Sequence, residues 1–397
     1  MRYMDEELGA AAPGELEKAG EIEHVDLVTV RLPFVHPFSI SAATWDCKEA
    51  LLLRLEARAA PSGRGGRGPT LVAWGECVAD PDPFYAYETT ATTAHIIADF
   101  LLPLVEADLT IGGIMERFRH VRGHGMAKAT VENALLDLAA KRRGAALHEL
   151  LGYGARPVPS GVSLGLQESP AALVEKAREA VEAGYHRVKM KVKKGKDVEY
   201  VRAVREAFPD LALMVDANGD YSLDDAEHLA ELDAFGLTMI EQPLSYSDIY
   251  QHSLLQRRLK TALCLDESIL GLDDAAAAIA LGACRVINIK QGRVGGLLES
   301  RRIARYAALK GLPSWSGGMD ETGIGRAVNI HLQTDPDFSI PGDTAETARY
   351  FHEDLVEPPV TLGPGGWISV PAAGPGIGVE PLPERLDRLT IARRRLK

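Results

Sequence analysis

The sequence predicts an α/β protein in which a parallel β/α barrel follows a smaller α+β domain. Between residues 158 and 316, short apolar runs alternate with helical segments at a spacing of about 25 residues. That spacing fits one buried strand and one helix per repeat. Before residue 150, three strand-like runs stand close together and are followed by helical segments. Regular strand–helix alternation is typical of a (β/α)8 barrel, in which every strand ends at the same mouth.

The α+β domain is expected over residues 22–155, after a flexible tail at 1–21 that is rich in Ala, Gly and Glu. Period-two alternation of apolar residues predicts an antiparallel meander of three strands, at 24–32, 50–57 and 70–76. Helical periodicity then runs through residues 127–141 and ends at Gly144.

A glycine-rich stretch separates the second and third strands of this meander. Gly63, Gly65 and Gly68 match the dinucleotide-binding pattern G-x-G-x-x-G. That motif requires a helix that opens directly after the glycines, whereas Pro69 and another strand follow here. A hairpin loop explains the stretch better than a nucleotide site.

The barrel is expected over residues 156–345. Its first seven strands are predicted at 162–165, 186–192, 211–216, 239–241, 262–266, 286–290 and 312–316. Helices are predicted between them at 171–183, 198–207, 223–234, 273–281 and 298–310. The run at 338–340 is a candidate for the next strand. We expect the Gly- and Pro-rich segment 346–397 to pack back on the first domain, with Arg393–Arg395 as a solvated end.

Five charged residues follow the apolar runs at an almost constant interval. Lys191, Asp216, Glu241, Asp266 and Lys290 are separated by 25, 25, 25 and 24 residues. Because barrel strands deliver their C-terminal residues to one mouth, we expect these side chains to converge. We call this set the strand-end ladder. The alternative is that each charge stands in an ordinary solvated loop.

Three carboxylates flanked by lysines suit a hard divalent cation, since Mg²⁺ prefers oxygen ligands. Neither His nor Cys accompanies them, which disfavours zinc. Lys189 and Lys191 are two apart and point to one face of their strand, so a nearby like charge is expected to lower a lysine pKa and create a base. The alternative is an exposed Lys-x-Lys on an edge strand. Lys290 would act from the opposite wall, and Arg293 either holds it or is a solvated loop residue.

These groups fit abstraction of the proton α to a carboxylate, with a metal ion stabilising the charge that develops. The substrate is then a small-molecule carboxylate. A net charge of −12 disfavours nucleic acid as a partner. The four cysteines form no C-x-x-C pair, no apolar run reaches membrane-spanning length, and the acidic start lacks a signal-peptide pattern. We therefore expect a cytoplasmic protein without a membrane partner.

Several motifs are similar to those of the enolase superfamily, in its muconate lactonising enzyme subgroup. They are Lys189-Met190-Lys191, Val215-Asp216-Ala217-Asn218, Ile240-Glu241-Gln242-Pro243, Leu265-Asp266-Glu267-Ser268 and Asn288-Ile289-Lys290. Residues 286–296, 317–327 and 341–344 resemble the o-succinylbenzoate synthase / N-succinylamino acid racemase family more narrowly. The resemblance covers about residues 22–380.

The resemblance implies a modified TIM barrel, (β/α)7β, under an α+β capping domain, and a homo-oligomer. It implies Mg²⁺, with Mn²⁺ as a substitute, on Asp216, Glu241 and Asp266, and catalysis by Lys191 and Lys290. In a syn dehydration of menaquinone biosynthesis Lys191 would remove the α-proton, and in a racemase the two lysines would serve opposite faces. Substrate-binding or supporting roles fall to the Phe38–Trp45 loop and to Lys189, Ser163, Asn218, Glu267, Arg293, Gly317, Gly318 and Met319.

The chain departs from the family pattern at Asp320, at Gln291 and in the sequence of the Ser39–Trp45 loop, so the identity of the substrate stays open. A carboxylate at Asp320, if it faced the pocket, would repel a succinyl carboxylate. A dipeptide epimerase would carry Asp-x-Asp near Asp343, where this chain has one Asp. That enzyme, a muconate cycloisomerase and a non-catalytic scaffold of the same fold remain alternatives. Dehydratases of the mandelate racemase type normally have His where Lys290 stands.

Overall fold

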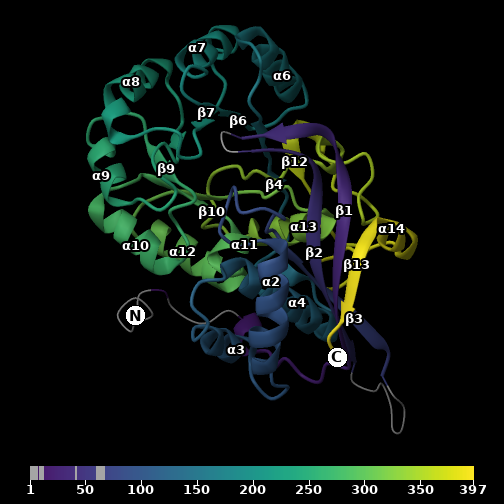
Figure 1. The fold of residues 1–397 in the computed structure, drawn as a ribbon. Helices are drawn as coiled ribbons and strands as arrows, with labels where there is room; N and C mark the ends of the chain where they lie inside the picture. The colour runs from purple at the N-terminus through teal and green to yellow at the C-terminus, as the bar shows by residue number, and fades with distance from the viewer. Residues whose placement is uncertain (1–7, 9–12, 41–42, 60–67) are drawn as a thin grey trace.

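The computed structural model describes residues 8, 13–40, 43–59 and 68–397. Figure 1 shows a ring of strands and helices and, beside it, an antiparallel sheet with helices packed against it. We call this second part the cap; it comprises the strands β1–β3 within residues 24–77, the helices α2–α5 within residues 90–150 and the C-terminal strand β13 at residues 390–395. The long strands β1 and β2 extend from the cap toward the ring.

The cap sheet has the strand order β13-β1-β2-β3. The predicted antiparallel meander is confirmed, with longer strands than expected: β1 (His24–Ser39), β2 (Thr44–Arg58) and β3 (Thr70–Cys77). The cap helices are α2 (Thr90–Ile96), α3 (Ile111–Phe118), α4 (Gly125–Arg143) and α5 (Leu147–Leu150).

The fourth strand, β13 (Thr390–Arg395), corrects the expectation of a solvated C-terminal end. It pairs antiparallel with β1, and Arg395 forms an ion pair with the buried Asp26. Most side chains of β13 are exposed, so the strand lacks the apolar alternation by which strands are predicted.

The ring is a parallel sheet in the order β5-β6-β7-β8-β9-β10-β11. Its strands are β5 (Gly161–Leu164), β6 (Arg187–Lys191), β7 (Leu213–Asp216), β8 (Ile240–Glu241), β9 (Leu263–Leu265), β10 (Val286–Ile289) and β11 (Ser314–Ser316). All seven predicted strands are confirmed, and each boundary lies within two residues of the prediction.

Helices connect these strands on the outside of the ring (Figure 1). They are α6 (Pro170–Glu182), α7 (Val198–Ala207), α8 (Ala226–Ala230), α9 (Tyr250–Gln256), α10 (Leu272–Leu281), α11 (Gln291–Val294), α12 (Leu297–Leu309) and α13 (Gly323–Leu332). The helix expected at 223–234 is instead α8 flanked by 3-10 turns.

Residues 338–343 connect the two edges of the ring without forming a regular strand. Ser339 N donates to Ser314 O of β11 at 3.1 Å, and Gly161 N of β5 donates to Gly342 O at 2.7 Å. Pro341 has no N–H to donate, which explains why this segment cannot extend into a full ladder. The last position of the predicted barrel is therefore filled irregularly.

Helix α4 lies between the cap sheet and the ring and is buried along most of its length. Strand β3 approaches it so closely that a Cβ atom at Gly75 would lie 2.0 Å from Thr130 O. On its other side, Glu132 accepts a hydrogen bond from Leu298 N (3.0 Å), at the start of α12. Cap side chains thus satisfy N–H groups at the start of a barrel helix, which holds the two parts together.

The chain ends contact the cap. Ala19 N donates to Leu109 O at 3.0 Å, so the later part of the expected tail is attached there, whereas most of its earlier part lies outside the described residues. Gly63 and Gly65 lie outside them as well. Leu147 N of α5 donates to Gly376 O at 2.8 Å. The remaining elements are β4 (Val158–Pro159), β12 (Trp367–Ile368) and α14 (Pro383–Leu389).

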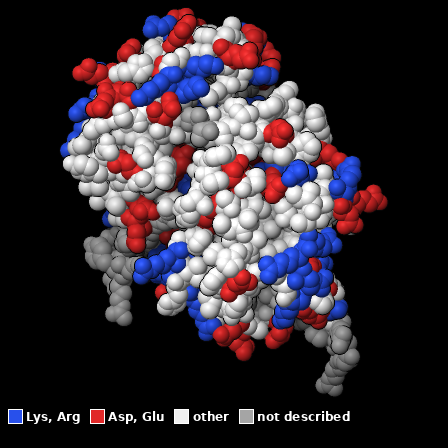
Figure 2. Space-filling model, in the orientation of Figure 1, with Lys and Arg blue, Asp and Glu red and all other residues white. Residues whose placement is uncertain are grey.

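On the face shown in Figure 2, acidic and basic side chains are interspersed, and they surround a paler central area. Within the part of the chain that the structure describes, no helix has the length and apolar character that crossing a membrane requires.

Candidate active site

The five residues of the strand-end ladder lie at the C-terminal ends of five consecutive barrel strands. Lys191 ends β6, Asp216 ends β7 and Glu241 ends β8, and they stand in register across the sheet. Asp266 and Lys290 directly follow β9 and β10. All five side chains are buried. The constant spacing in the sequence therefore becomes one group of charges at the mouth of the barrel.

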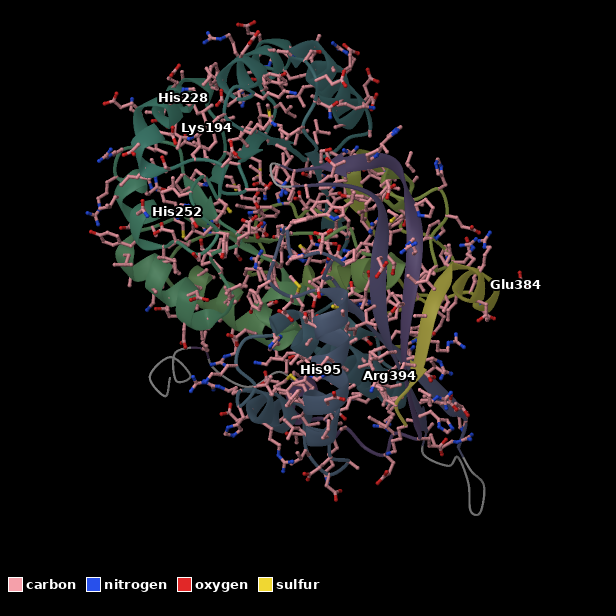
Figure 3. The ribbon with its side chains drawn as sticks, in the orientation of Figure 1. His95, Lys194, His228, His252, Glu384 and Arg394 are labelled. Atoms are coloured by element: carbon pink, nitrogen blue, oxygen red, sulfur yellow. The ribbon has the colours of Figure 1, made fainter. Side chains whose placement is uncertain are left out.

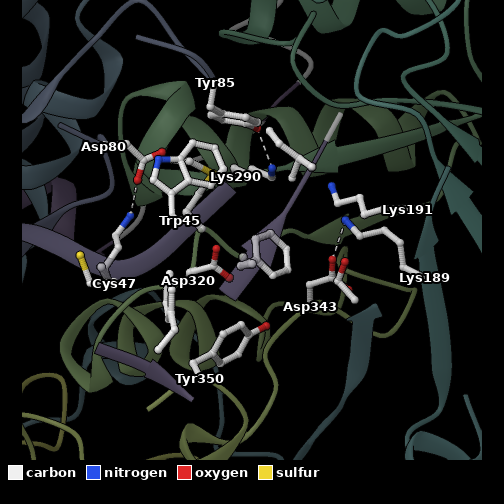
Figure 4. Close-up of a pocket in the computed structure, with 17 residues that line it drawn as sticks. Trp45, Cys47, Asp80, Tyr85, Lys189, Lys191, Lys290, Asp320, Asp343 and Tyr350 are labelled. Atoms are coloured by element: carbon white, nitrogen blue, oxygen red, sulfur yellow. Dashed lines mark hydrogen bonds and ion pairs between the residues drawn. The ribbon is translucent and has the colours of Figure 1, made fainter. Parts of the chain in front are cut away.

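The two lysines at the ends of the ladder line one pocket from different sides (Figure 4). Lys191 Nζ donates to Asp216 Oδ2 at 2.6 Å and to Asn218 Oδ1 at 2.7 Å. Lys290 Nζ lies 2.9 Å from Asp266 Oδ2. Three strands separate β6 from β10, so the two ammonium groups approach the pocket from opposite walls.

Lys189 lies deeper on β6 and connects several carboxylates. Its Nζ is 3.3 Å from Asp216 Oδ2, 3.2 Å from Glu241 Oε2 and 2.7 Å from Asp343 Oδ2. The expectation that a like charge would lower its pKa is wrong. Burial does lower the pKa of Lys189, but the charges of Asp343 and Glu241 more than offset this and raise it well above the usual value. Lys189 therefore stays protonated where it lines the pocket.

The carboxylates of the ladder differ in protonation behaviour. Burial raises the pKa of Glu241 to about 8, and the charge of Asp216 adds to the increase. For Asp266, burial raises the pKa, but Arg293 and Lys290 outweigh it and hold the pKa below its usual range. Glu241 is thus the carboxylate whose negative charge is least compensated by its neighbours.

The donor chemistry of this group fits a hard divalent cation. Glu241 Oε2 is buried and accepts no hydrogen bond, although Lys189 Nζ is 3.2 Å away, and Glu267 Oε2 has no hydrogen-bond partner either. The described residues that line the pocket include no histidine; His95, His228 and His252 belong to helices α2, α8 and α9 (Figure 3). Oxygen donors alone favour Mg²⁺ over zinc.

The carboxylates are not yet gathered around one point. Among the residues that the structure describes, no three His, Cys, Asp or Glu side chains form a ready-made metal cluster. Lysine ammonium groups instead pair with the carboxylates of the ladder, at 2.6 Å for Asp216 and 2.9 Å for Asp266. A bound cation would take over part of this neutralising role.

The backbone beside the ladder is unusual. Four described residues other than glycine have positive φ, and three of them lie near the pocket: Asn218 (+44°), Gln242 (+36°) and Asp320 (+55°). Such conformations are uncommon outside glycine and cluster at functional sites. They turn the chain sharply after a strand, which keeps the strand-end side chains directed at the mouth.

The residues expected to contact substrate divide into two groups. Ser163, Gly318 and Met319 line the pocket. So do Phe38, Ile40 and Trp45 of the β1–β2 hairpin, while residues 41–42 lie outside the described residues.

Gly317 is not part of the pocket lining and has a packing role instead. A Cβ atom at this position would lie 2.8 Å from Lys290 Cγ and 2.3 Å from Asn288 Oδ1. A side chain there would displace Lys290, so glycine is required for the close approach of this loop to β10.

Two residues predicted to support the ladder are buried beside it. Arg293 forms an ion pair with Asp266, so the alternative of a solvated loop arginine is wrong. Glu267 accepts a hydrogen bond from Asn218 Nδ2 at 2.8 Å, and burial raises its pKa to about 7.

The two single residues that depart from the family pattern have different positions. Gln291 faces the cap, where its Oε1 accepts a hydrogen bond from Asn133 Nδ2 at 2.9 Å. Asp320 lines the pocket.

Sequence reasoning missed Tyr85, which the cap contributes from the loop between β3 and α2. Its hydroxyl accepts a hydrogen bond from Lys290 Nζ at 2.7 Å, and the ammonium lies 4.8 Å from the ring centroid. Burial raises the pKa of Tyr85, so the hydroxyl stays protonated and directs its hydrogen toward Asp266 Oδ2, 3.4 Å away. The loop has no periodicity, so no signal in the sequence points to this contact.

Comparisons with known proteins agree with this geometry. Residues 172–385 match the family described as enolase C-terminal domain-like. Residues 23–152 match the N-terminal domain of the mandelate racemase / muconate lactonizing enzyme family. The chain belongs to the enolase superfamily. Its predicted modified-barrel fold with a cap is confirmed by these matches and by solved structures of the superfamily.

Within the superfamily, the chain is similar to particular enzymes and solved structures. An o-succinylbenzoate synthase of Geobacillus stearothermophilus is 44% identical over 93% of this chain and 96% of its own length. An N-succinylamino acid racemase of Amycolatopsis sp. is 43% identical over 94% of this chain and 98% of its own. A solved enolase-superfamily structure from Listeria innocua matches with a TM-score of 0.88 and 37% identity, over 95% and 99% of the two chains.

Proposed function

We propose that the chain removes the proton α to a carboxylate, with racemisation of N-acylamino acids as the reaction that its geometry supports best. The observation that carries this proposal is that Lys191 and Lys290 line one pocket from opposite walls. A racemase must serve both faces of one carbon, whereas a syn elimination needs a single base. Dehydration to o-succinylbenzoate is the second candidate, because relatives of both names match this chain at similar identity.

We also propose Asp216, Glu241 and Asp266 as the ligands of Mg²⁺, with Mn²⁺ as a substitute. When bound, the cation would hold the substrate carboxylate and offset the negative charge that develops as the proton leaves. Lys189 stays protonated and keeps the ligand carboxylates in place, since it contacts two of them.

In the racemisation, Lys191 as the free amine accepts the α-proton from one face of the substrate. The C–H bond breaks, an N–H bond forms, and the electron pair is delocalised into the carboxylate. The Lys290 ammonium then gives a proton to the opposite face, and the roles reverse for the other enantiomer. In the dehydration, Lys191 removes the α-proton and protonates the leaving hydroxyl on the same face, while Lys290 stays charged.

The alternatives are less well supported. Asp343, where an epimerase would hold the substrate amine, is already paired with Lys189 (2.7 Å) and Arg187 (2.7 Å). A muconate cycloisomerase would use the same strand-end ladder, so only an assay with its substrate distinguishes that activity from the proposed one. The homo-oligomer and the cytoplasmic location stay predictions, of which light scattering on the purified protein tests the first.

The experiment is α-proton exchange in D₂O, followed by NMR, with N-acetyl- and N-succinyl-phenylalanine and with the cyclohexadiene carboxylate that the synthases dehydrate. We expect exchange or dehydration only with Mg²⁺ or Mn²⁺, loss with a chelator and recovery when metal is restored. Binding of metal without turnover of any acid would favour a non-catalytic scaffold.

A further inference from the structure

One carboxylate in the pocket belongs to neither the ladder nor an ion pair. Asp320 lines the pocket, and in Figure 4 its carboxylate lies between Trp45 and Tyr350 and points into the open space. Among the described residues it accepts no hydrogen bond and forms no close ion pair. Every ladder carboxylate, in contrast, is paired with a lysine.

The nearest cation is already compensated by another carboxylate. Lys48 Nζ on β2 lies 3.0 Å from Asp80 Oδ1 and donates to Val78 O at 3.2 Å. Among the described residues that line this end of the pocket, the carboxylates of Asp80 and Asp320 thus face one ammonium group, which leaves one negative charge in excess, while Glu321 and Arg326 nearby carry opposite charges. Burial raises the pKa of Asp320 to about 6, and the charge of Lys48 opposes a larger increase.

The backbone at Asp320 has a φ of +55°. The loop before it packs closely against the closing segment of the ring, since a Cβ atom at Gly318 would lie 2.5 Å from Asp343 O. Apolar side chains, among them Phe38 and Trp45, line other parts of the pocket. A charge beside apolar groups selects ligands by the sign of their charge where water screens it only weakly.

We propose that Asp320 selects the charge of the substrate: the arm of the pocket that ends at this residue takes a cationic or hydrogen-bond-donating group and rejects a second carboxylate. This rests on the proposed function and names its substrate class, an N-acylamino acid with an amine on its side chain or on its acyl group.

A second cavity gives a carboxylate a different place. It shares Phe34, Phe38 and Tyr350 with the main pocket, and its lining includes Arg349 and Lys176, of which Lys176 is paired with Glu179 at 2.9 Å. Arg349 gives this arm a positive charge and Asp320 gives the first arm a negative one, so a substrate with unlike ends fits in one orientation only.

The test compares matched substrates at about pH 8, where Asp320 is ionised. The side-chain series is N-acetyl-lysine, N-acetyl-norleucine and N-acetyl-glutamate. The acyl series is N-(4-aminobutanoyl)-, N-butanoyl- and N-succinyl-phenylalanine. The kcat/KM of α-proton exchange is measured for wild type, D320N and D224N. Asp224 is exposed on the barrel surface, so D224N changes the net charge equally without touching the pocket.

In at least one series, we expect the kcat/KM of the cationic substrate to exceed that of the anionic substrate by about tenfold or more, as for a partly buried charge contact. D320N removes most of that preference, and D224N keeps it. Preference for the anion in both series, or an unchanged ratio in D320N, overturns the inference. If the neutral substrates exchange their α-proton but wild type shows no preference between cationic and anionic substrates, this inference fails and the proposed function stands. If no substrate of either series exchanges its α-proton, the proposed function fails.

Discussion

The pocket has a barrel wall and a cap wall, and the two differ in how their residues are held. On the barrel wall, Lys191, Asp216 and Asp266 stand at strand ends and are paired with one another, with Lys290 or with Arg293 of α11. On the cap wall, Trp45 and Tyr85 come from a hairpin and a loop. A rigid sheet fixes groups that must meet the reacting carbon, and loops supply groups that vary with the substrate. We infer that the strand ends of the barrel wall carry out the chemistry, whereas the cap wall and the barrel loop that carries Asp320 adjust and select.

The largest effect is expected on the barrel wall. Lys191→Ala and Lys290→Ala should each lower the rate of racemisation by about a thousandfold or more, because each removes a proton carrier that the other cannot replace. Polarimetry with N-acyl-phenylalanine measures this. Lys194→Ala removes an exposed lysine on the barrel surface and should have no effect. A near wild-type rate in either pocket variant would break the division between the walls.

A smaller effect is expected for the cap wall. Tyr85→Phe removes the hydroxyl that contacts Lys290 and should lower kcat by about tenfold, the value of a hydrogen bond to a charged group. The loss should be larger for proton transfer at the face that Lys290 serves, as shown by exchange from each enantiomer in D₂O.

The matched control is Tyr87→Phe, since Tyr87 is exposed and two residues away in the same loop. Equal loss in both variants, or equal loss at both faces with Tyr85→Phe, would show that the tyrosine only supports the loop.

Changes at the interface between the cap and the barrel should affect the stability of the protein and not its catalysis. His148 of α5 and His331 of α13 stack there, with their Nδ1 atoms 3.1 Å apart. Burial lowers the pKa of His331 from 6.5 to about 3. The unfolded chain therefore binds a proton between these values that the folded chain does not, and stability is lost as pH falls below 6.5.

The contribution has a limiting slope of about 1.4 kcal/mol per pH unit. Urea unfolding of wild type and His331→Gln across that range measures it as a difference between the two proteins. His228→Gln is the control, because the contribution of His228 to stability depends on pH in the opposite direction. Hydrogen bonding to Asp197 raises the pKa of His228, so its contribution is lost as pH rises. A difference between wild type and His331→Gln that is constant with pH would contradict the assignment.

The same contrast between the walls explains which features are predictable from sequence. The ladder is visible because strands of a parallel barrel are buried, evenly spaced and end at one mouth, so the spacing alone places Lys191 and Lys290 together. The raised pKa of Lys189 is not predictable, because it depends on Asp343, which lies about 150 residues away in the sequence and is brought close only by the closing segment of the ring.

Tyr85 and β13 escape prediction for a different reason. A loop has no period, and β13 has an almost wholly exposed surface, so neither leaves the apolar pattern on which such predictions depend. Asp320 stands out in the sequence as an unusual residue, but whether it faces the pocket depends on a positive φ that the sequence does not specify.

The most direct test of the central claim, that two lysines serve opposite faces of one carbon, is enantiomer-resolved α-proton exchange in D₂O by the two lysine variants. The proteins are first checked for folding by circular dichroism and for Mg²⁺ binding by calorimetry. We predict that each variant still exchanges the proton of one enantiomer, that the two variants retain opposite enantiomers, and that neither racemises. Retention of the same enantiomer by both variants would contradict the account.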